Sequence, residues 1–292
     1  MPVGAADKAL FDCVIIVDWS AASAPSPAKP SADAIWTCCA DPMGEQTLYH
    51  RTRAQAEAYL RGQIMAAQAR GARLLIGCDF PFAYPRGFAH ALTGQASARA
   101  VWRYVQGRIT DSDSNANNRF DVANHINARF GNGPFWGRPA GRDAPHLPAR
   151  KTVDYTALPF AERRSIDRAI PSAQPVWKLY TTGSVGSQAL MGLPMIARLA
   201  GMNGVSVWPF DESLTDVVLA EVYPSILAKA VARQLTQTGG IKDAVQVQLL
   251  ARAMVHQPPD VWAQMTALPH PDCREEGWIL GAGFGHLLEA AL

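Results

Sequence analysis

The chain has 292 residues, with 27 Lys and Arg residues against 25 Asp and Glu residues, so that its formal net charge is +2. This length suits one large α/β domain or a core domain with a sizeable insertion, and a hydrophobic content of 48% is enough for a packed core. The near balance of charge gives no support for a nucleic-acid coat protein or a membrane-surface protein, although it is compatible with a local basic groove.

The N-terminal part of the chain begins with three predicted strands. Residues 13–17 form a continuous apolar run rich in β-branched side chains, which is typical of a strand buried on both faces. Residues 34–40 and 46–51 predict two further strands, and the turn-forming residues 41–44 lie between them. Because this connection is short, we expect the second and third strands to pair antiparallel.

A helix and a fourth strand follow. Residues 54–70 are dominated by Ala, Leu, Gln and Arg and predict a helix, which Gly71 ends in a left-handed conformation. Residues 73–78 predict another buried strand. The expected order of elements is therefore β-β-β-α-β.

The middle of the chain, residues 81–204, has a different character. It is rich in Pro, Gly, Asn and Arg, with helices expected near 96–106 and 118–130. Residues 131–150 carry four Gly and four Pro residues and predict a long surface loop. Long loops of this kind are usually functional or mobile. We interpret residues 81–204 as a loop-rich and helical insertion or lid within a single domain of residues 1–292.

Regular elements return in the last third of the chain. Residues 205–210 and 216–222 predict two strands, and residues 225–235 predict a helix after a proline. Residues 243–256 predict a second helix because their apolar side chains recur at i, i+3, i+4 and i+7. A short apolar segment, 277–281, precedes a last half-helix.

Cysteine content and hydropathy predict the compartment. No segment approaches ~18 uninterrupted apolar residues, and no basic stretch precedes an apolar run at the N-terminus, so we expect a cytoplasmic protein without a membrane segment. The five cysteines are odd in number, and Cys13, Cys38 and Cys78 lie in strand-like runs, which favours free thiols over a disulfide framework. Cys38 and Cys39 are adjacent and would point to opposite faces of a sheet, so they make a poor metal clamp. The oligomeric state stays open.

Four acidic residues occupy similar places in the predicted elements. Asp18 follows the first strand, Asp79 follows the fourth, Glu221 lies near the end of the 216–222 strand, and Asp243 opens a helix. Ligands of open α/β sheets bind at the carboxyl ends of the parallel strands. If the three strands are parallel neighbours, we expect Asp18, Asp79 and Glu221 to converge and Asp243 to approach from the flanking helix.

Converging carboxylates predict a cation site. Crowded carboxylates repel one another and raise each other's pKa unless a cation neutralises them. Their hard oxygen atoms suit Mg²⁺ or Mn²⁺, and a pair of such ions activates water and stabilises the leaving oxygen in phosphodiester cleavage. Each acid also has an ordinary structural interpretation, because Asp is common in turns and helix caps and an acid in the first turn of a helix complements the helix dipole.

The motifs around these acids resemble those of a known family. The order β-β-β-α-β with an aspartate at the end of the first strand is similar to the ribonuclease H-like fold. More narrowly, the chain resembles the family called domain of unknown function 429, whose members are predicted nucleases. The motifs that carry the resemblance are Val17-Asp18-Trp19-Ser20, Cys78-Asp79-Phe80-Pro81-Phe82, Glu221-Val222-Tyr223-Pro224, Lys242-Asp243-Ala244 and Glu276-Gly277-Trp278-Ile279.

This resemblance implies a mixed sheet, with three antiparallel strands followed by parallel strands, flanked by helices. It implies that Asp18, Asp79, Glu221 and Asp243 are both metal ligands and catalytic residues. The chain departs from the family at one point, because Trp19-Ser20-Ala21-Ala22 replaces the glycine-rich segment after the first aspartate. The family's activity is itself inferred from its fold, and fold alone does not settle function.

Two further segments and one serine are candidate substrate contacts. Lys178 and Ser184 belong to a loop of small residues whose backbone N–H groups are able to bind phosphate, although an ordinary helix-entry turn explains the same composition. Arg138 and Trp136 lie in a basic loop that combines charge with stacking surface for a single nucleic-acid strand, or that is simply solvated. Ser20, the last residue of the first aspartate motif, is the third candidate.

Three functions are compatible with these residues. The first is a metal-dependent phosphodiester hydrolase that acts on a nucleic acid or a nucleotide-like phosphate ester. The second is an ATP-using phosphotransferase of the actin and sugar-kinase type, whose usual glycine-rich phosphate turn is absent after Asp18. The third is a non-catalytic module in which the inherited fold binds a ligand.

Overall fold

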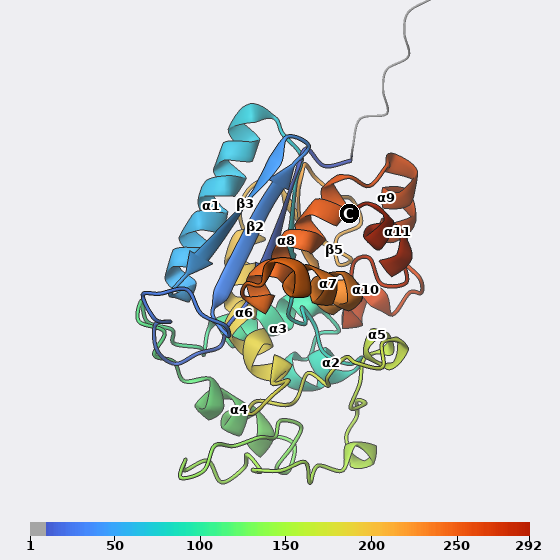
Figure 1. Ribbon diagram of the computed structural model, residues 1–292. Coiled ribbons are helices and arrows are strands. Elements are labelled where there is room, and N and C mark those ends of the chain that lie inside the picture. Colours follow the sequence, from blue (N-terminus) through green and yellow to red (C-terminus); the bar gives the residue numbers. More distant parts are fainter. Residues whose placement is uncertain (1–9) are drawn as a thin grey trace, which may run out of the picture. The chain divides into compact units, whose positions relative to one another are not determined.

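Continuous apolar runs form the centre of a six-stranded mixed sheet in the computed structural model, which describes residues 10–292 (Figure 1). The strand order is β3-β2-β1-β4-β6-β5. The strands are β1 (Cys13–Asp18), β2 (Ile35–Asp41), β3 (Gly44–His50), β4 (Leu74–Cys78), β5 (Val205–Trp208) and β6 (Val217–Glu221). β1, β2 and β3 pair antiparallel, whereas β1, β4, β6 and β5 pair parallel. The expected α/β class with a mixed sheet is therefore confirmed.

Helices cover both faces of this sheet. α8 (Lys242–Val255) packs against β1, β2 and β3, and Figure 1 shows α1 (Arg53–Arg70) on the other side of the same strands. Both faces of the parallel strands are thus buried, which explains why β4 and β6 contain only apolar residues, glycine and one terminal acid or thiol. The smaller helices near this sheet are α7 (Ala228–Thr238), α9 (Pro259–Thr266), α11 (Gly285–Ala290) and a 3₁₀ turn, η2 (Pro224–Leu227).

The ends of α1 follow from local chemistry. The Thr52 side chain accepts a hydrogen bond from the Gln55 N–H and satisfies a backbone donor at the start of the helix. Gly71 ends the helix at φ +61°, a left-handed conformation that costs little without a Cβ atom. The predicted helix and its glycine cap are confirmed.

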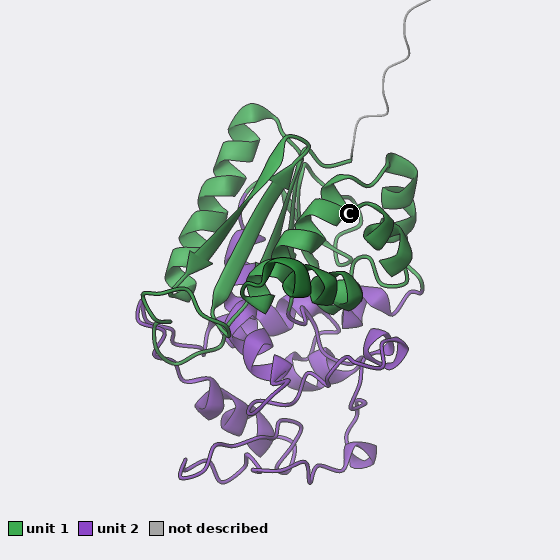
Figure 2. Cartoon of the chain, viewed as in Figure 1, with its two compact units in different colours: residues 1–79, 203–269, 279–292 green, residues 80–202, 270–278 purple. Residues whose placement is uncertain are grey.

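The chain divides into two compact units (Figure 2). Unit 1 comprises residues 1–79, 203–269 and 279–292 and holds the whole sheet. Unit 2 comprises residues 80–202 and 270–278. Its long segment has nearly the bounds of the expected insertion, 81–204, and the short segment 270–278 joins it from a part of the chain that the sequence pattern assigned to the tail.

Unit 2 is helical and has its own aromatic core. Its helices are α2 (Phe88–Thr93), α3 (Ala98–Gln106), α4 (Arg119–Ala128), α5 (Ser165–Ala169), α6 (Val185–Leu199), α10 (Cys273–Glu276) and the 3₁₀ turn η1 (Tyr155–Ala157). The fully buried Trp177 contacts the rings of Tyr84, Phe88, Phe135 and Phe160 at centroid distances of 4.9–5.5 Å. Residues 131–150 contain neither helix nor strand, as expected.

α6 is the largest element that the sequence pattern does not predict. It contains Gly186, Gly192 and Pro194, which are unfavourable inside helices. A Cβ atom at Gly192 would lie 2.2 Å from Cζ of the buried Phe80, so close packing requires glycine there. Tertiary packing thus overrides helix propensity in this segment.

The remaining general expectations concern membranes and thiols. Within residues 10–292, every helix is too short or too polar to cross a bilayer. All five cysteines are free thiols. Cys38, Cys78 and Cys273 are buried, whereas Cys13 and Cys39 are half-buried.

Candidate functional site

Asp18 and Asp79 meet at the carboxyl ends of two neighbouring parallel strands. Val17 of β1 is in register with Cys78 of β4, so the two aspartates follow at the same level and on the same face of the sheet. The Asp79 N–H donates to the Val17 carbonyl over 3.1 Å and continues the ladder past the end of β4. A hydrogen bond joins the two carboxyl groups. The predicted approach of Asp18 to Asp79 is present.

Asp243 reaches the same face from α8. It lies in the first turn of the helix, and the helix packs on β1, β2 and β3. Its negative charge raises the pKa of both Asp18 and Asp79, which places it within electrostatic reach of the pair. Its Oδ2 atom accepts a hydrogen bond from the Asp33 N–H over 2.8 Å.

The loop between β1 and β2 holds these carboxylates from its two ends. At one end, the Trp19 N–H donates to Asp79 Oδ1 over 2.8 Å. At the other end, the Asp33 N–H binds Asp243, and the Asp33 carbonyl accepts from Ser20 Oγ over 3.0 Å. Arg53, the buried first residue of α1, donates from Nη1 to two carbonyls of the same loop. The loop is thereby tied to both the carboxylates and α1.

Asp33 is the acid that the sequence pattern missed. It does not follow a parallel strand and stands at the end of an Ala-, Ser- and Pro-rich loop, so its position resembles that of an ordinary turn residue. Its φ of +57° is left-handed, which Asp tolerates better than most residues. Its charge contributes to the raised pKa of Asp18. An Asp before a strand, preceded by turn-forming residues, is the only local signal for it.

The crowding of the acids raises the pKa of the central pair. The pKa of Asp18 is well above its ordinary value, first because the carboxyl group is buried and then because Asp79 and Asp243 are negatively charged. Burial raises the pKa of Asp79 to about 7, opposed by hydrogen bonds from the Trp19 N–H and from Asp18. Because the two carboxyl groups interact this closely, Asp18 and Asp79 gain and lose protons as a pair.

Glu221 does not join this cluster. It is in register with Cys78 and therefore points to the same face as Cys78 and Val17, opposite to the face of Asp18 and Asp79. Val222 takes the level of Asp79, and its side chain would meet a Cβ atom placed on Gly77, which confirms the shared face of residues 77, 79 and 222. The expected convergence of Glu221 with the aspartates is wrong. Glu221 is level with Cys78, the residue before Asp79, and successive residues of a strand point to opposite faces.

The three aspartates offer the type of ligand atom that a hard divalent cation prefers, but they do not form a complete coordination sphere. Asp18, Asp79 and Asp243 provide carboxylate oxygens, which Mg²⁺ and Mn²⁺ prefer. Within the described residues, no group of three or more His, Cys, Asp or Glu side chains is arranged to hold a metal ion. A bound cation would neutralise the negative charge that burial and mutual repulsion disfavour at Asp18 and Asp79.

Of the candidate substrate contacts, Ser20 belongs to unit 1 and lies in the loop that holds the carboxylates. The other four belong to unit 2. Lys178 pairs with Trp136 through a backbone bridge, and its ammonium group lies 5.7 Å from the Trp136 ring centroid. Arg138 donates to the carbonyls of Leu147 and Arg142 within the 131–150 loop. Ser184 is the residue before α6, so the loop enters a helix as its structural interpretation predicts.

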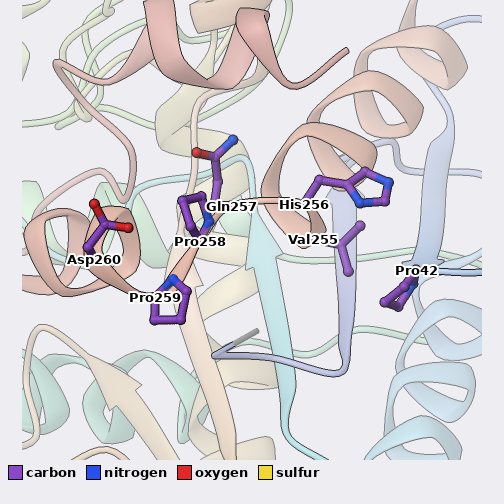
Figure 3. A pocket seen from close by; sticks show the side chains of 7 residues that line it. All are labelled: Pro42, Val255, His256, Gln257, Pro258, Pro259 and Asp260. Atoms are coloured by element: carbon purple, nitrogen blue, oxygen red, sulfur yellow. The ribbon is translucent and has the colours of Figure 1, made fainter. Parts of the chain in front are cut away.

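A separate cavity lies at the far end of α8 from Asp243. Figure 3 shows its lining side chains, which come from the end of α8, the start of α9 and the turn between β2 and β3. The cavity has a volume of about 550 Å³ and is lined by Pro42, Val255, His256, Gln257, Pro258, Pro259 and Asp260. Because α8 rises about 1.5 Å per residue, roughly 20 Å of helix separates this cavity from the carboxylates. It is therefore not part of the candidate site.

Comparison of the chain with protein-family models, with curated proteins and with solved structures gave no match. A functional proposal for this chain therefore depends on the carboxylate geometry and on the order of the strands. Both are properties of unit 1.

Proposed function

We propose that the protein is a metal-dependent phosphodiester hydrolase of the ribonuclease H-like superfamily, with Asp18, Asp79 and Asp243 as its metal-binding carboxylates. The observation that carries the proposal is the gathering of three acids from distant parts of the chain at the carboxyl ends of β1 and β4. The strand order, with three antiparallel strands followed by parallel ones, supports the same superfamily. The resemblance to the domain of unknown function 429 family is part of this proposal.

The electrostatics of the site support a cation. A raised pKa at both Asp18 and Asp79 means that the local environment disfavours their negative charge. Such an arrangement destabilises the fold at neutral pH unless a counter-ion binds, and active sites commonly retain costs of this kind. A bound Mg²⁺ or Mn²⁺ ion would supply Lewis-acid stabilisation of a phosphate oxygen and a lowered pKa for an attacking water.

The residues of this chain would hold and orient the carboxylates. The Trp19 N–H fixes one oxygen of Asp79, which leaves the other oxygen for Asp18 or for a ligand. The Asp33 N–H fixes one oxygen of Asp243 in the same way. Ser20 Oγ, which donates to the Asp33 carbonyl, links the two anchoring points and is a candidate contact for a substrate phosphate. The partner in this proposal is a nucleic acid or a nucleotide-like phosphate ester.

The test is cleavage of single- and double-stranded DNA and RNA with Mg²⁺ or Mn²⁺, compared with a chelator control. We expect Asp18→Asn and Asp79→Asn to lower the cleavage rate by at least about a hundredfold. Each substitution removes a negatively charged oxygen ligand on which binding of the catalytic metal ion depends. Glu221→Gln is the matched variant, since Glu221 faces the opposite side of the sheet and its loss should leave the metal dependence intact.

Two outcomes would contradict the proposal. The first is an absence of divalent-metal-dependent cleavage together with an absence of Mn²⁺ binding by calorimetry. The second is loss of activity in Glu221→Gln with retention in Asp79→Asn, which would place the chemistry on the other face of the sheet. Stabilisation by ATP without cleavage would favour the phosphotransferase alternative.

A further inference from the structure

Two cysteine side chains from neighbouring strands meet in unit 1. The Sγ atoms of Cys13 and Cys39 lie 3.0 Å apart. Cys39 of β2 pairs with Ile15 of β1, so Cys13 is its diagonal neighbour on the same face of the sheet. The S–S bond of a disulfide is about 2.05 Å long. Bond formation therefore requires the two sulfur atoms to approach by roughly one ångström.

Cys13 and Cys39 are the two partly exposed cysteines of the chain. The other three cysteines are buried. A recess of about 380 Å³ lies beside Cys39, and Asp41, Met43 and Tyr59 also line it. A small oxidant can therefore reach Cys39 without opening the core.

The surroundings shift the pKa values of the two thiols in opposite directions. The hydrogen bond from Cys13 lowers the pKa of Cys39, and a hydrogen bond from Tyr59 and the charge of Arg70 act in the same direction, while burial and the charge of Asp41 oppose them. The same Cys13–Cys39 hydrogen bond, together with burial, raises the pKa of Cys13. Cys39 is thus the more readily ionised thiol of the pair. A partly exposed cysteine of lowered pKa beside a second cysteine is the arrangement found in redox-sensing sites.

We propose that Cys13 and Cys39 are a modification site at which hydrogen peroxide forms a reversible disulfide. The Cys39 thiolate attacks one peroxide oxygen, the O–O bond breaks, and a sulfenic acid and hydroxide form. The Cys13 sulfur then attacks the Cys39 sulfur, the S–S bond forms, and the S–O bond breaks. The departing hydroxide takes the Cys13 proton as water, so the two sulfur atoms together lose two electrons to the peroxide.

This site is distinct from the carboxylate cluster. Cys13 is the first residue of β1 and Asp18 is the last, so about 17 Å of strand separates them at roughly 3.3 Å per residue. The oxidation chemistry needs no metal and no phosphate substrate. It is therefore independent of the proposed hydrolase activity.

The experiment treats the full chain with hydrogen peroxide, alkylates the remaining thiols under denaturing conditions and maps the peptides by mass spectrometry. A Cys38→Ala background makes the assignment unambiguous, because Cys38 adjoins Cys39 but is buried on the opposite face. We expect a Cys13–Cys39 disulfide that dithiothreitol reverses. In Cys13→Ser, Cys39 should stop at the sulfenic acid, which a cyclic diketone traps. In Cys39→Ser, oxidation of Cys13 should be about tenfold slower or more, because the thiolate is the nucleophile.

Met43 provides an internal control for the oxidant. Its side chain is 97% exposed beside the same recess, so peroxide converts it to the sulfoxide wherever the reagent has acted. If Met43 is oxidised while Cys13 and Cys39 both remain open to alkylation, the proposal is overturned. A disulfide that joins either cysteine to Cys38, or that joins two chains, would overturn it as well.

Discussion

At the scale of single residues, the central feature is a pair of carboxyl groups that cannot both ionise without cost. Asp18 and Asp79 share a hydrogen bond, and both pKa values are raised, mainly because the groups are buried. The folded protein therefore holds protons in this pair more tightly than the unfolded chain does. By linkage, the contribution of this pair to stability is greatest below the ordinary pKa of Asp and is lost as the pH rises through the folded-state pKa.

Asp79→Asn should remove this penalty. The pKa of Asp79 rises from an ordinary value of 3.8 to about 7, so the loss of stability lies between about pH 4 and pH 7. At pH 8 we expect the free energy of unfolding of the variant to be higher by about 2–4 kcal/mol. The upper end of this range corresponds to the full shift of about three pKa units. At pH 4 the two proteins should differ little. Urea unfolding at both pH values measures the effect.

Asp113→Asn is the control for that measurement. Asp113 is exposed, so its substitution should change stability by less than about 0.5 kcal/mol at either pH. A stability difference between Asp79→Asn and the parent protein that is equal at pH 4 and pH 8 would contradict the raised pKa. A loss of stability at pH 8 would show that the ionised Asp79 stabilises the fold.

At the scale of elements, two glycines show that α1 and α6 are stabilised in different ways. Local helix propensity accounts for α1, whereas α6 depends on tertiary packing. Gly62 lies in α1 with open space where its Cβ would be, whereas a Cβ at Gly192 of α6 would collide with the Phe80 ring. α1 was predictable from its composition, and α6 was hidden by its two glycines and its proline. The two glycines make a matched pair within helix interiors.

Alanine at these two positions should have opposite effects. Gly62→Ala should raise the free energy of unfolding by about 0.5–1 kcal/mol, because alanine has the higher helix propensity and meets nothing. Gly192→Ala should lower it by about 1–3 kcal/mol, because the buried Phe80 ring must move. Thermal unfolding of both variants measures the difference. Equal effects of the same sign would mean that Phe80 does not pack against Gly192.

The loop from β1 to β2 is the other informative element. It brings the backbone N–H groups of Trp19 and Asp33 to two different carboxylates. Neither contact was predictable, because each depends on the path in space of a sixteen-residue loop, residues 19–34. The loop also brings Asp33 close enough to raise the pKa of Asp18.

At the scale of the whole molecule, a divalent cation should act as a stabilising ligand of the folded state. If Asp18, Asp79 and Asp243 bind Mg²⁺ or Mn²⁺, stability rises with metal concentration, by about 2.7 kcal/mol at a hundredfold excess over Kd. Protons compete for the same carboxylates, so the stabilisation should be larger at pH 8 than at pH 5. Differential scanning fluorimetry at several metal concentrations and at both pH values tests this. The double variant Asp18→Asn/Asp79→Asn should show no change in melting temperature when metal is added. A response of that double variant equal to the parent's would place the cation elsewhere.

Features that depend on residues close together in the chain could be predicted before the fold was known. The apolar runs of β1, β4 and β6, the helix 53–70 with its Gly71 cap, and the β-β-β-α-β order all follow from local periodicity and turn chemistry. Features that depend on the alignment of distant segments emerged only from the folded chain. A one-residue offset of β6 turns Glu221 away from Asp18 and Asp79, a left-handed Asp33 joins them, and Cys13 meets Cys39 on the opposite face. Register and packing arise from contacts across the sheet, and the side-chain pattern within a single strand does not encode them.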